Sequence, residues 1–161
     1  MATIIVGIGE YAVSSQPGIV IKTLALGSCV AIIVYAPKFS AAGMAHVALP
    51  DSSIGSDRTK TLPAYFADSA IPNLIGDFKK LGITKSSDLQ IKLTGGAAIM
   101  DPNGTFNIGK RNVLAIRKIL WKYRLGARKE DVGKDFSRSV KILVDTGVVT
   151  ISSPRKGEWN I

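Results

Sequence analysis

The chain has 161 residues, of which 46% are hydrophobic and 20% are charged. A chain of this length most simply forms one domain, here residues 1–161, with enough apolar side chains for a packed core. No apolar stretch approaches the roughly 18 residues that a membrane span needs, and the first residues lack the basic region of a signal peptide. The sequence therefore predicts a cytoplasmic protein without membrane insertion.

The formal net charge of +9 favours acidic partners, which include nucleic acid, anionic lipid and acidic protein. The positive residues are spread along the chain, and the densest stretch, residues 110–129, is typical of the exposed face of a helix. Charge alone therefore does not identify a nucleic-acid-binding protein, and we expect no nucleic-acid partner.

The sequence holds a single cysteine, Cys29, and a single histidine, His46. No disulfide can form within the chain, which is typical of a reducing compartment. These two side chains cannot build a four-ligand zinc site without added carboxylates. We therefore expect no metal and no other cofactor.

The first part of the chain has the pattern of successive strands. Residues 3–8 are β-branched, residues 18–26 alternate, and residues 29–35 form an apolar run typical of a strand buried on both faces. A further short strand is predicted over 42–49. Residues 51–61, rich in Ser, Asp and Gly, indicate a surface loop.

Helical spacing of apolar residues predicts two main helices, over 64–81 and 110–123. The other predicted elements are a strand over 89–93, a hairpin of 140–144 with 148–152, and a tail over 153–161 that can fray. Roughly six to eight strands, not alternating with the helices, predict a single layered α+β domain with a mixed β-sheet core.

The segment Gly27-Ser28-Cys29 places a thiol where a loop meets an apolar strand. Glycine lets a substrate carbonyl approach the backbone, and free amides at such a break can stabilise an oxyanion. Gly27 and Ser28 are therefore candidates for an oxyanion or substrate loop. Cys29 is the candidate nucleophile, because a thiolate attacks carbonyl carbon once a neighbouring base has removed its proton.

His46 is the sole candidate base, and neighbouring strands could bring it beside Cys29. Its imidazole needs an orienting group, and Thr23, six residues before Cys29, could accept a hydrogen bond through its hydroxyl or its carbonyl. The alternative is that the cysteine is a small buried hydrophobe and the histidine a satisfied core residue. The pair is more informative than either residue alone.

Five segments together resemble the CheD family of chemoreceptor glutamine deamidases: VGIGEYAV at 6–13, TLALGSCV at 23–30, MAHVALP at 44–50, LTGGA at 93–97 and FNIGKRN at 106–112. The resemblance covers nearly the whole chain. It implies a fold like that of the toxin-type cysteine deamidases. It also implies a triad in which Cys29 is the nucleophile, His46 the base and Thr23 the orienting residue.

The resemblance further implies the partners. The expected substrates are glutamine side chains on the cytoplasmic helices of methyl-accepting chemotaxis receptors, which become glutamates with release of ammonia. The expected regulator is a phosphatase of the CheC family. The alternative function is a non-catalytic adaptor that docks to and regulates such a phosphatase.

Overall fold

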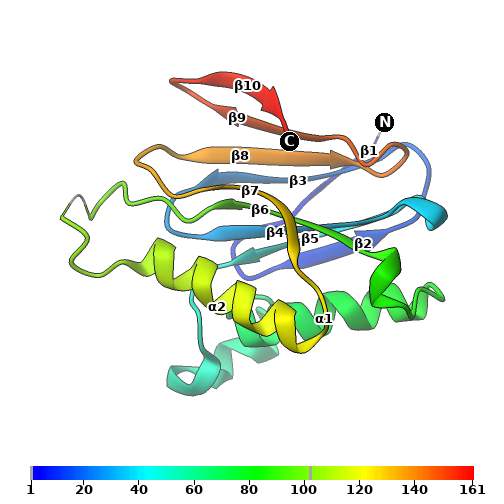
Figure 1. Cartoon of the computed structure of the whole chain (residues 1–161), viewed down its shortest axis with the longest axis horizontal. Coiled ribbons are helices and arrows are strands. Elements are labelled where there is room, and N and C mark those ends of the chain that lie inside the picture. The colour runs from blue at the N-terminus through cyan, green and yellow to red at the C-terminus, as the bar shows by residue number, and fades with distance from the viewer. Residues whose placement is uncertain (1, 102) are drawn as a thin grey trace.

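The computed structural model describes residues 2–101 and 103–161, and its strands form two stacked sheets with a helix layer below them (Figure 1). One sheet, here called the outer sheet, has the order β1-β3-β8-β9-β10. Its strands are β1 (Ala2–Ile5), β3 (Ile19–Leu26), β8 (Arg138–Leu143), β9 (Val149–Ser153) and β10 (Gly157–Asn160). Strand β1 pairs in parallel with β3, and the other neighbours are antiparallel.

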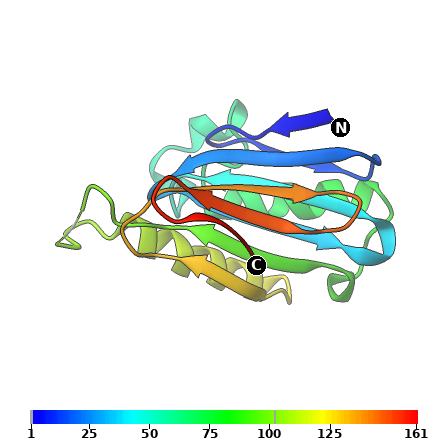
Figure 2. The same cartoon turned by 90° about the horizontal axis from the view of Figure 1, so that it is seen from above.

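The second sheet, here called the central sheet, has the order β2-β5-β4-β6-β7. Its strands are β2 (Tyr11–Ser14), β5 (Ala41–Val47), β4 (Val30–Ala36), β6 (Gln90–Gly95) and β7 (Ala127–Val132). Only β6 and β7 pair in parallel. Both sheets are therefore mixed, and Figure 2 shows the outer sheet covering the central one.

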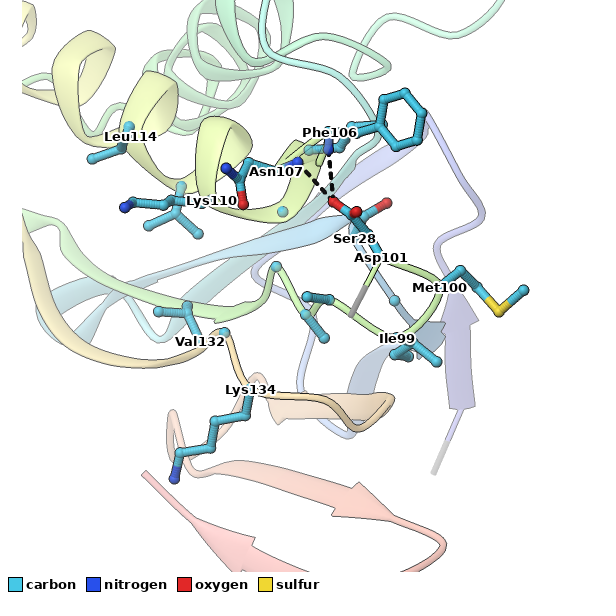
Figure 3. Close-up of a pocket in the computed structure, with 18 of the residues that line it drawn as sticks. Ser28, Ile99, Met100, Asp101, Phe106, Asn107, Lys110, Leu114, Val132 and Lys134 are labelled. Atoms are coloured by element: carbon cyan, nitrogen blue, oxygen red, sulfur yellow. Dashed lines mark hydrogen bonds between the residues drawn. The ribbon is translucent and has the colours of Figure 1, made fainter. Parts of the chain in front are cut away.

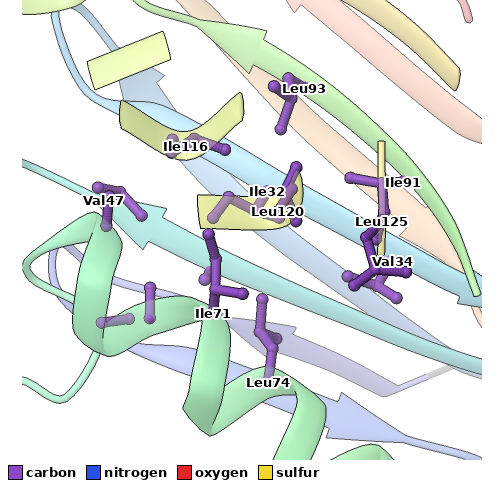
Figure 4. Close-up of a cluster of buried hydrophobic side chains, with 14 of the residues drawn as sticks. Ile32, Val34, Val47, Ile71, Leu74, Ile91, Leu93, Ile116, Leu120 and Leu125 are labelled. Carbon is purple, nitrogen blue, oxygen red and sulfur yellow. The ribbon is translucent and has the colours of Figure 1, made fainter. Parts of the chain in front are cut away.

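Two helices, α1 (Ala67–Lys80) and α2 (Ile108–Lys122), cover the face of the central sheet that lies away from the outer sheet (Figure 1). Their apolar faces, including Ile71 and Leu120, pack on alternate residues of β4 such as Ile32 (Figure 4). None of the helices in the described part of the chain has the length and apolar content needed to cross a membrane.

Strand β4 is apolar along its whole length because both of its faces are buried. Ile32 and Val34 face the helices, whereas Ala31 and Ile33 face the outer sheet. The second core lies between the two sheets and also contains Met44 of β5. The uninterrupted hydrophobicity of this segment thus reflects a strand sandwiched between two cores.

The predicted α+β class and the two main helices are confirmed, since α1 and α2 differ from the predicted ranges by at most three residues at each end. The strand count was wrong: the described residues form ten strands, in two sheets. Residues 51–61 contain two short 3-10 turns, Ser52–Ile54 and Ser56–Lys60. The expected tail includes β10, which pairs with β9.

Candidate active site

Cys29 lies in the turn between β3 and β4, immediately before β4 begins. This turn, residues 27–29, is called the Cys29 turn below. The carbonyl of Gly27 accepts a hydrogen bond from the Ala97 amide, and the carbonyl of Cys29 accepts one from the Gly96 amide, both at 2.8 Å. Two backbone bonds therefore hold the turn against the segment after β6.

Gly95 permits this close approach of the two segments. Its φ is +106°, and a Cβ at this position would lie 2.3 Å from the Cys29 carbonyl oxygen. Any other residue would push the Cys29 turn away. Gly95, within the LTGGA segment, thus lets the backbone after β6 lie against the Cys29 turn.

The register of β4 and β5 places His46 near Cys29 on one face of the central sheet. Ala31 pairs with His46, and side chains two residues apart on a strand project to the same face. Cys29 packs against the core between the sheets, which is also the side that His46 occupies. Cys29 and His46 are thus diagonal neighbours, positions that lie roughly 7–8 Å apart in an antiparallel pair.

The imidazole of His46 is fixed from behind by Thr23 of β3. The Thr23 hydroxyl donates to the Val6 carbonyl at 2.6 Å and lies 2.7 Å from His46 Nδ1. Because its one hydrogen goes to Val6, the hydroxyl must accept from His46, which assigns the ring proton to Nδ1. Nε2 therefore carries the lone pair of a base.

Both side chains of this bond are buried, Thr23 at 0% and His46 at 2% exposed. The backbone of His46 is held too, because its amide donates to Glu10 and its carbonyl accepts from Gly9. Nε2 has no hydrogen-bond partner among the described residues. The ring is thus rigidly placed, with its basic nitrogen left unsatisfied.

Burial favours the uncharged forms of both groups. It lowers the pKa of His46 from 6.5 to about 4. It also raises the pKa of the Cys29 thiol, an effect that the hydrogen bond from the backbone amide of Cys29 partly opposes. At neutral pH the resting pair is therefore a thiol and a neutral imidazole, so that the proton moves when the thiol reacts.

The amides of Ser28 and Cys29 donate no hydrogen bond to another residue in the part of the chain that the structure describes. Backbone N–H groups without an acceptor at a nucleophilic side chain are the donors of an oxyanion hole. The geometry of the Cys29 turn is therefore suited to stabilising negative charge on a carbonyl oxygen.

A pocket of about 670 Å³ opens beside the Cys29 turn (Figure 3). It reaches the turn through Gly27 and Ser28, while Thr23, Cys29 and His46 are not among its lining residues. The walls are mainly apolar, with Ile99, Met100, Phe106, Val113, Leu114 and Val132, and the cations Lys110 and Lys134 lie among them. The pocket offers space for a chain segment next to the thiol.

The loop between β6 and α2 projects beyond one end of the sheets and forms one wall of the pocket (Figures 1 and 3). The Asp101 carboxylate accepts hydrogen bonds from the amides of Thr105, Phe106 and Asn107. These bonds fix residues 105–107 against Asp101, and the side chains of Met100 and Phe106 are 92% and 67% exposed.

Two buried polar residues near the site were missed by the sequence analysis. Asn112 of α2 donates from Nδ2 to the carbonyls of Ser28 and Ala48, both at 3.0 Å. Arg138 donates to the Asp131 carboxylate and to the Gly133 carbonyl. These two bonds fix residues 131–133, two of which line the pocket wall across from the loop between β6 and α2. The sequence did carry a signal for the burial of Asn112: it is a polar residue at a position of α2 that the helical spacing assigns to the apolar face.

Among the residues described, no three His, Cys, Asp or Glu side chains gather where they could hold a metal ion. The groups that the site presents are a thiol, an imidazole and backbone donors.

Comparison with known proteins identifies the relatives of this chain. Residues 48–153 match the family model described as CheD chemotactic sensory transduction. A protein of Syntrophotalea carbinolica named probable chemoreceptor glutamine deamidase CheD is 50% identical over 162 residues, which cover 100% of both chains. The chemoreceptor glutamine deamidase CheD of Thermotoga maritima is 40% identical over 154 residues, covering 96% of this chain and 94% of its own.

Among solved structures, the crystal structure of the Bacillus licheniformis hypothetical protein YfiH aligns with a TM-score of 0.47 and 13% identity. It covers 76% of this chain and 49% of its own, a likeness too low to support an argument. The family match and the full-length relatives show that the chain belongs to the CheD family.

Proposed function

We propose that this chain is a protein-glutamine deamidase that converts specific glutamine side chains of methyl-accepting chemotaxis receptors to glutamate and releases ammonia. The observation that carries the proposal is the hydrogen bond from His46 Nδ1 to Thr23, because it leaves the basic Nε2 on the sheet face shared with Cys29. Family membership and the names of the relatives supply the substrate class.

In the first half of the reaction, His46 Nε2 takes the proton of the Cys29 thiol as sulfur attacks the carboxamide carbon of glutamine. The oxygen of the tetrahedral intermediate receives hydrogen bonds from the free amides of the Cys29 turn. His46 then returns the proton to the nitrogen, the C–N bond breaks, and ammonia leaves. The product of this half is a thioester between Cys29 and the substrate.

In the second half, His46 removes a proton from water, which attacks the thioester carbonyl. The C–S bond breaks, the proton returns to sulfur, and a glutamate side chain is released. Thr23 holds the imidazole in one tautomer throughout, since its hydroxyl accepts only from a protonated Nδ1. The residues of this chain complete the cycle without a cofactor.

The pocket beside the Cys29 turn accommodates the receptor segment that flanks the glutamine. Exposed apolar side chains at its rim, Met100 and Phe106, supply contact area, while Lys110 and Lys134 favour acidic neighbours of the glutamine. The positive net charge steers an acidic receptor segment toward the chain in the same way.

A second candidate function is docking to a phosphatase of the CheC family, which the chain would regulate as an adaptor. The exposed Met100 and Phe106 favour it, because apolar side chains at the surface are typical of a partner-binding site. The adaptor needs neither the Thr23 bond to His46 nor free amides at Cys29. Those features therefore favour catalysis as the first function.

The test is ammonia release from a receptor cytoplasmic fragment that carries glutamine, incubated with the wild-type chain and with Cys29→Ala. We expect release with the wild type and none above background with the variant. Equal release from both would overturn the nucleophile assignment, and release from neither would leave the adaptor function as the better account.

A further inference from the structure

Asn112 occupies an unusual place in the site, because it binds the two segments that carry the thiol and the base. It lies on α2 with a fully buried side chain, and the motif at 106–112 that contains it has no assigned role. Its Nδ2 donates to the Ser28 carbonyl and to the Ala48 carbonyl, both at 3.0 Å. Both hydrogens of that nitrogen are therefore used within the Cys29 site.

These bonds stand where the sheet ladder ends. The β4–β5 pairing runs from Ala36 with Ala41 to Val30 with Val47, and one further step would set Cys29 opposite Ala48. The strands end at Val30 and Val47, so no ladder bond fixes the spacing at that step. The side-chain amide of Asn112 bridges the two segments at this step, because it donates to the Ser28 carbonyl and to the Ala48 carbonyl.

The bond to Ser28 also fixes an orientation. The Ser28 carbonyl and the Cys29 amide belong to one planar trans peptide unit, in which C=O and N–H point in opposite directions. Anchoring the carbonyl on Asn112 therefore aims the Cys29 N–H away from α2.

A second carbonyl of the turn is anchored in the same manner. The Gly27 carbonyl accepts from the Ala97 amide at 2.8 Å, which fixes the peptide unit that carries the Ser28 N–H. The amides of Ser28 and Cys29, which donate to no other described residue, thus belong to peptide units whose carbonyls are held. An oxyanion hole requires donors that are fixed before the substrate arrives.

We infer that Asn112 is a positioning residue that orients the Cys29 amide as an oxyanion donor. The inference rests on the proposed deamidase function. Asn112 has no contact with the substrate in this role. Loss of its side chain should therefore slow the chemical step and leave substrate binding unchanged.

The test compares deamidation with alkylation of Cys29 by iodoacetamide. Alkylation needs the thiolate but forms no oxyanion, whereas deamidation needs both. In Asn112→Ala we expect kcat for deamidation to fall about tenfold to hundredfold, with KM unchanged, because one donor is misplaced. The rate of alkylation should stay within about twofold of the wild type, because sulfur and base are untouched.

Asn112→Ser is the milder variant, since its hydroxyl keeps one donor, and it decides the matter if Asn112→Ala does not fold. Rates are normalised to the folded fraction of each variant, measured by thermal unfolding, so that unfolded chain does not lower them. The matched control is Asn73→Ala on α1, whose Nδ2 likewise donates to two carbonyls, of Ser69 and Pro63, remote from Cys29. We expect wild-type rates for this control.

Two results would overturn the inference while the proposed function stands: an unchanged kcat in both Asn112 variants, or deamidation and alkylation that fall in equal proportion. The second result would mean that Asn112 has a structural role only. A wild-type chain that releases no ammonia overturns the proposed function itself, and the role of Asn112 in the reaction falls with it.

Discussion

Thr23 and His46, the inner region of the site, are buried between the two sheets. The Cys29 turn, the outer region, lies at the end of the same interface next to a pocket, and Cys29 is half-buried. The inner region is held by side-chain and backbone hydrogen bonds of residues from β3 and β5. The outer region is a turn whose hydrogen bonds to other described residues are all accepted by its carbonyls. The geometry of the inner region is fixed by the pairing of whole strands, whereas the geometry of the outer region depends on a few hydrogen bonds to the Cys29 turn.

This difference separates the two tasks of the site. The inner region sets the tautomer and direction of the base, and burial keeps that base neutral at the pH of the cell. The outer region places the thiol and free amides where a substrate carbonyl can arrive. Substitutions in the inner region should therefore alter the base and the stability of the fold, whereas substitutions in the outer region should alter the covalent step or substrate binding.

Removing the thiol should have the largest effect on activity. Cys29→Ala and Cys29→Ser are each expected to lower kcat by at least about a thousandfold, because the covalent step is lost. Thermal stability should change little, since the residue is half-buried and small. A steady-state ammonia assay with a thermal melt measures both, and a Cys29→Ser variant within tenfold of wild type would contradict this.

Acid should destabilise the fold through the inner region. The pKa of His46 is about 4 in the folded chain against 6.5 ordinarily, so the unfolded chain binds its proton first as pH falls. Stability is then lost between pH 6.5 and 4, by roughly 3 kcal/mol, and no further below. Urea unfolding at pH 7 and pH 4 measures the loss.

The control for this prediction is His46→Gln, which removes the titrating group. Carboxylates contribute to the pH dependence of both chains, so the difference between the two slopes isolates His46. Identical slopes for the wild type and the variant would show that the imidazole is not held neutral by burial.

Thr23→Val should impair the base without removing it. The substitution takes away the acceptor for His46 Nδ1–H and the donor to Val6, and it frees the ring to change tautomer. We expect kcat to fall about tenfold to hundredfold. Thr23→Ser keeps the hydroxyl and should stay close to wild type; equal loss in both variants would indicate packing, not the hydrogen bond, as the cause.

A change at the pocket rim should have the smallest effect and should act on binding. Phe106→Ala is expected to raise KM for a receptor fragment about threefold to tenfold, with kcat unchanged, because it removes apolar contact area but none of the reacting groups. Trp121→Ala on α2 is the control, since this exposed residue lies outside the pocket. Similar KM values for both variants would exclude the rim from substrate binding.

The long periodic elements could be predicted from the sequence, and the short charged ones could not. Helices α1 and α2 show their apolar faces in the spacing of residues, and β4 shows its double burial as an apolar run. Strand β7, Ala127–Val132, is rich in charge because it lies at a sheet edge, where charged side chains oppose further pairing. Its sequence therefore carries no strand pattern.

The division into two sheets could not be predicted either. Strand β3 lies between β1 and β8, more than a hundred residues apart in the chain, and local periodicity contains no information on such partners. The placement of His46 near Cys29 was accessible, because consecutive strands usually pair. The burial of Asn112 had a signal in its position on the apolar face of α2, but its bonds to Ser28 and Ala48 did not, because they depend on where α2 crosses the end of β4 in the assembled fold.

Covalent chemistry of Cys29 on receptor glutamines is the central step of the proposed reaction. Peptide mass spectrometry of a receptor cytoplasmic fragment, before and after incubation with the wild-type chain or Cys29→Ala, tests this directly. We expect defined glutamines to become glutamates with the wild type alone. Conversion of the same glutamines by the Cys29→Ala chain at the wild-type rate would contradict it.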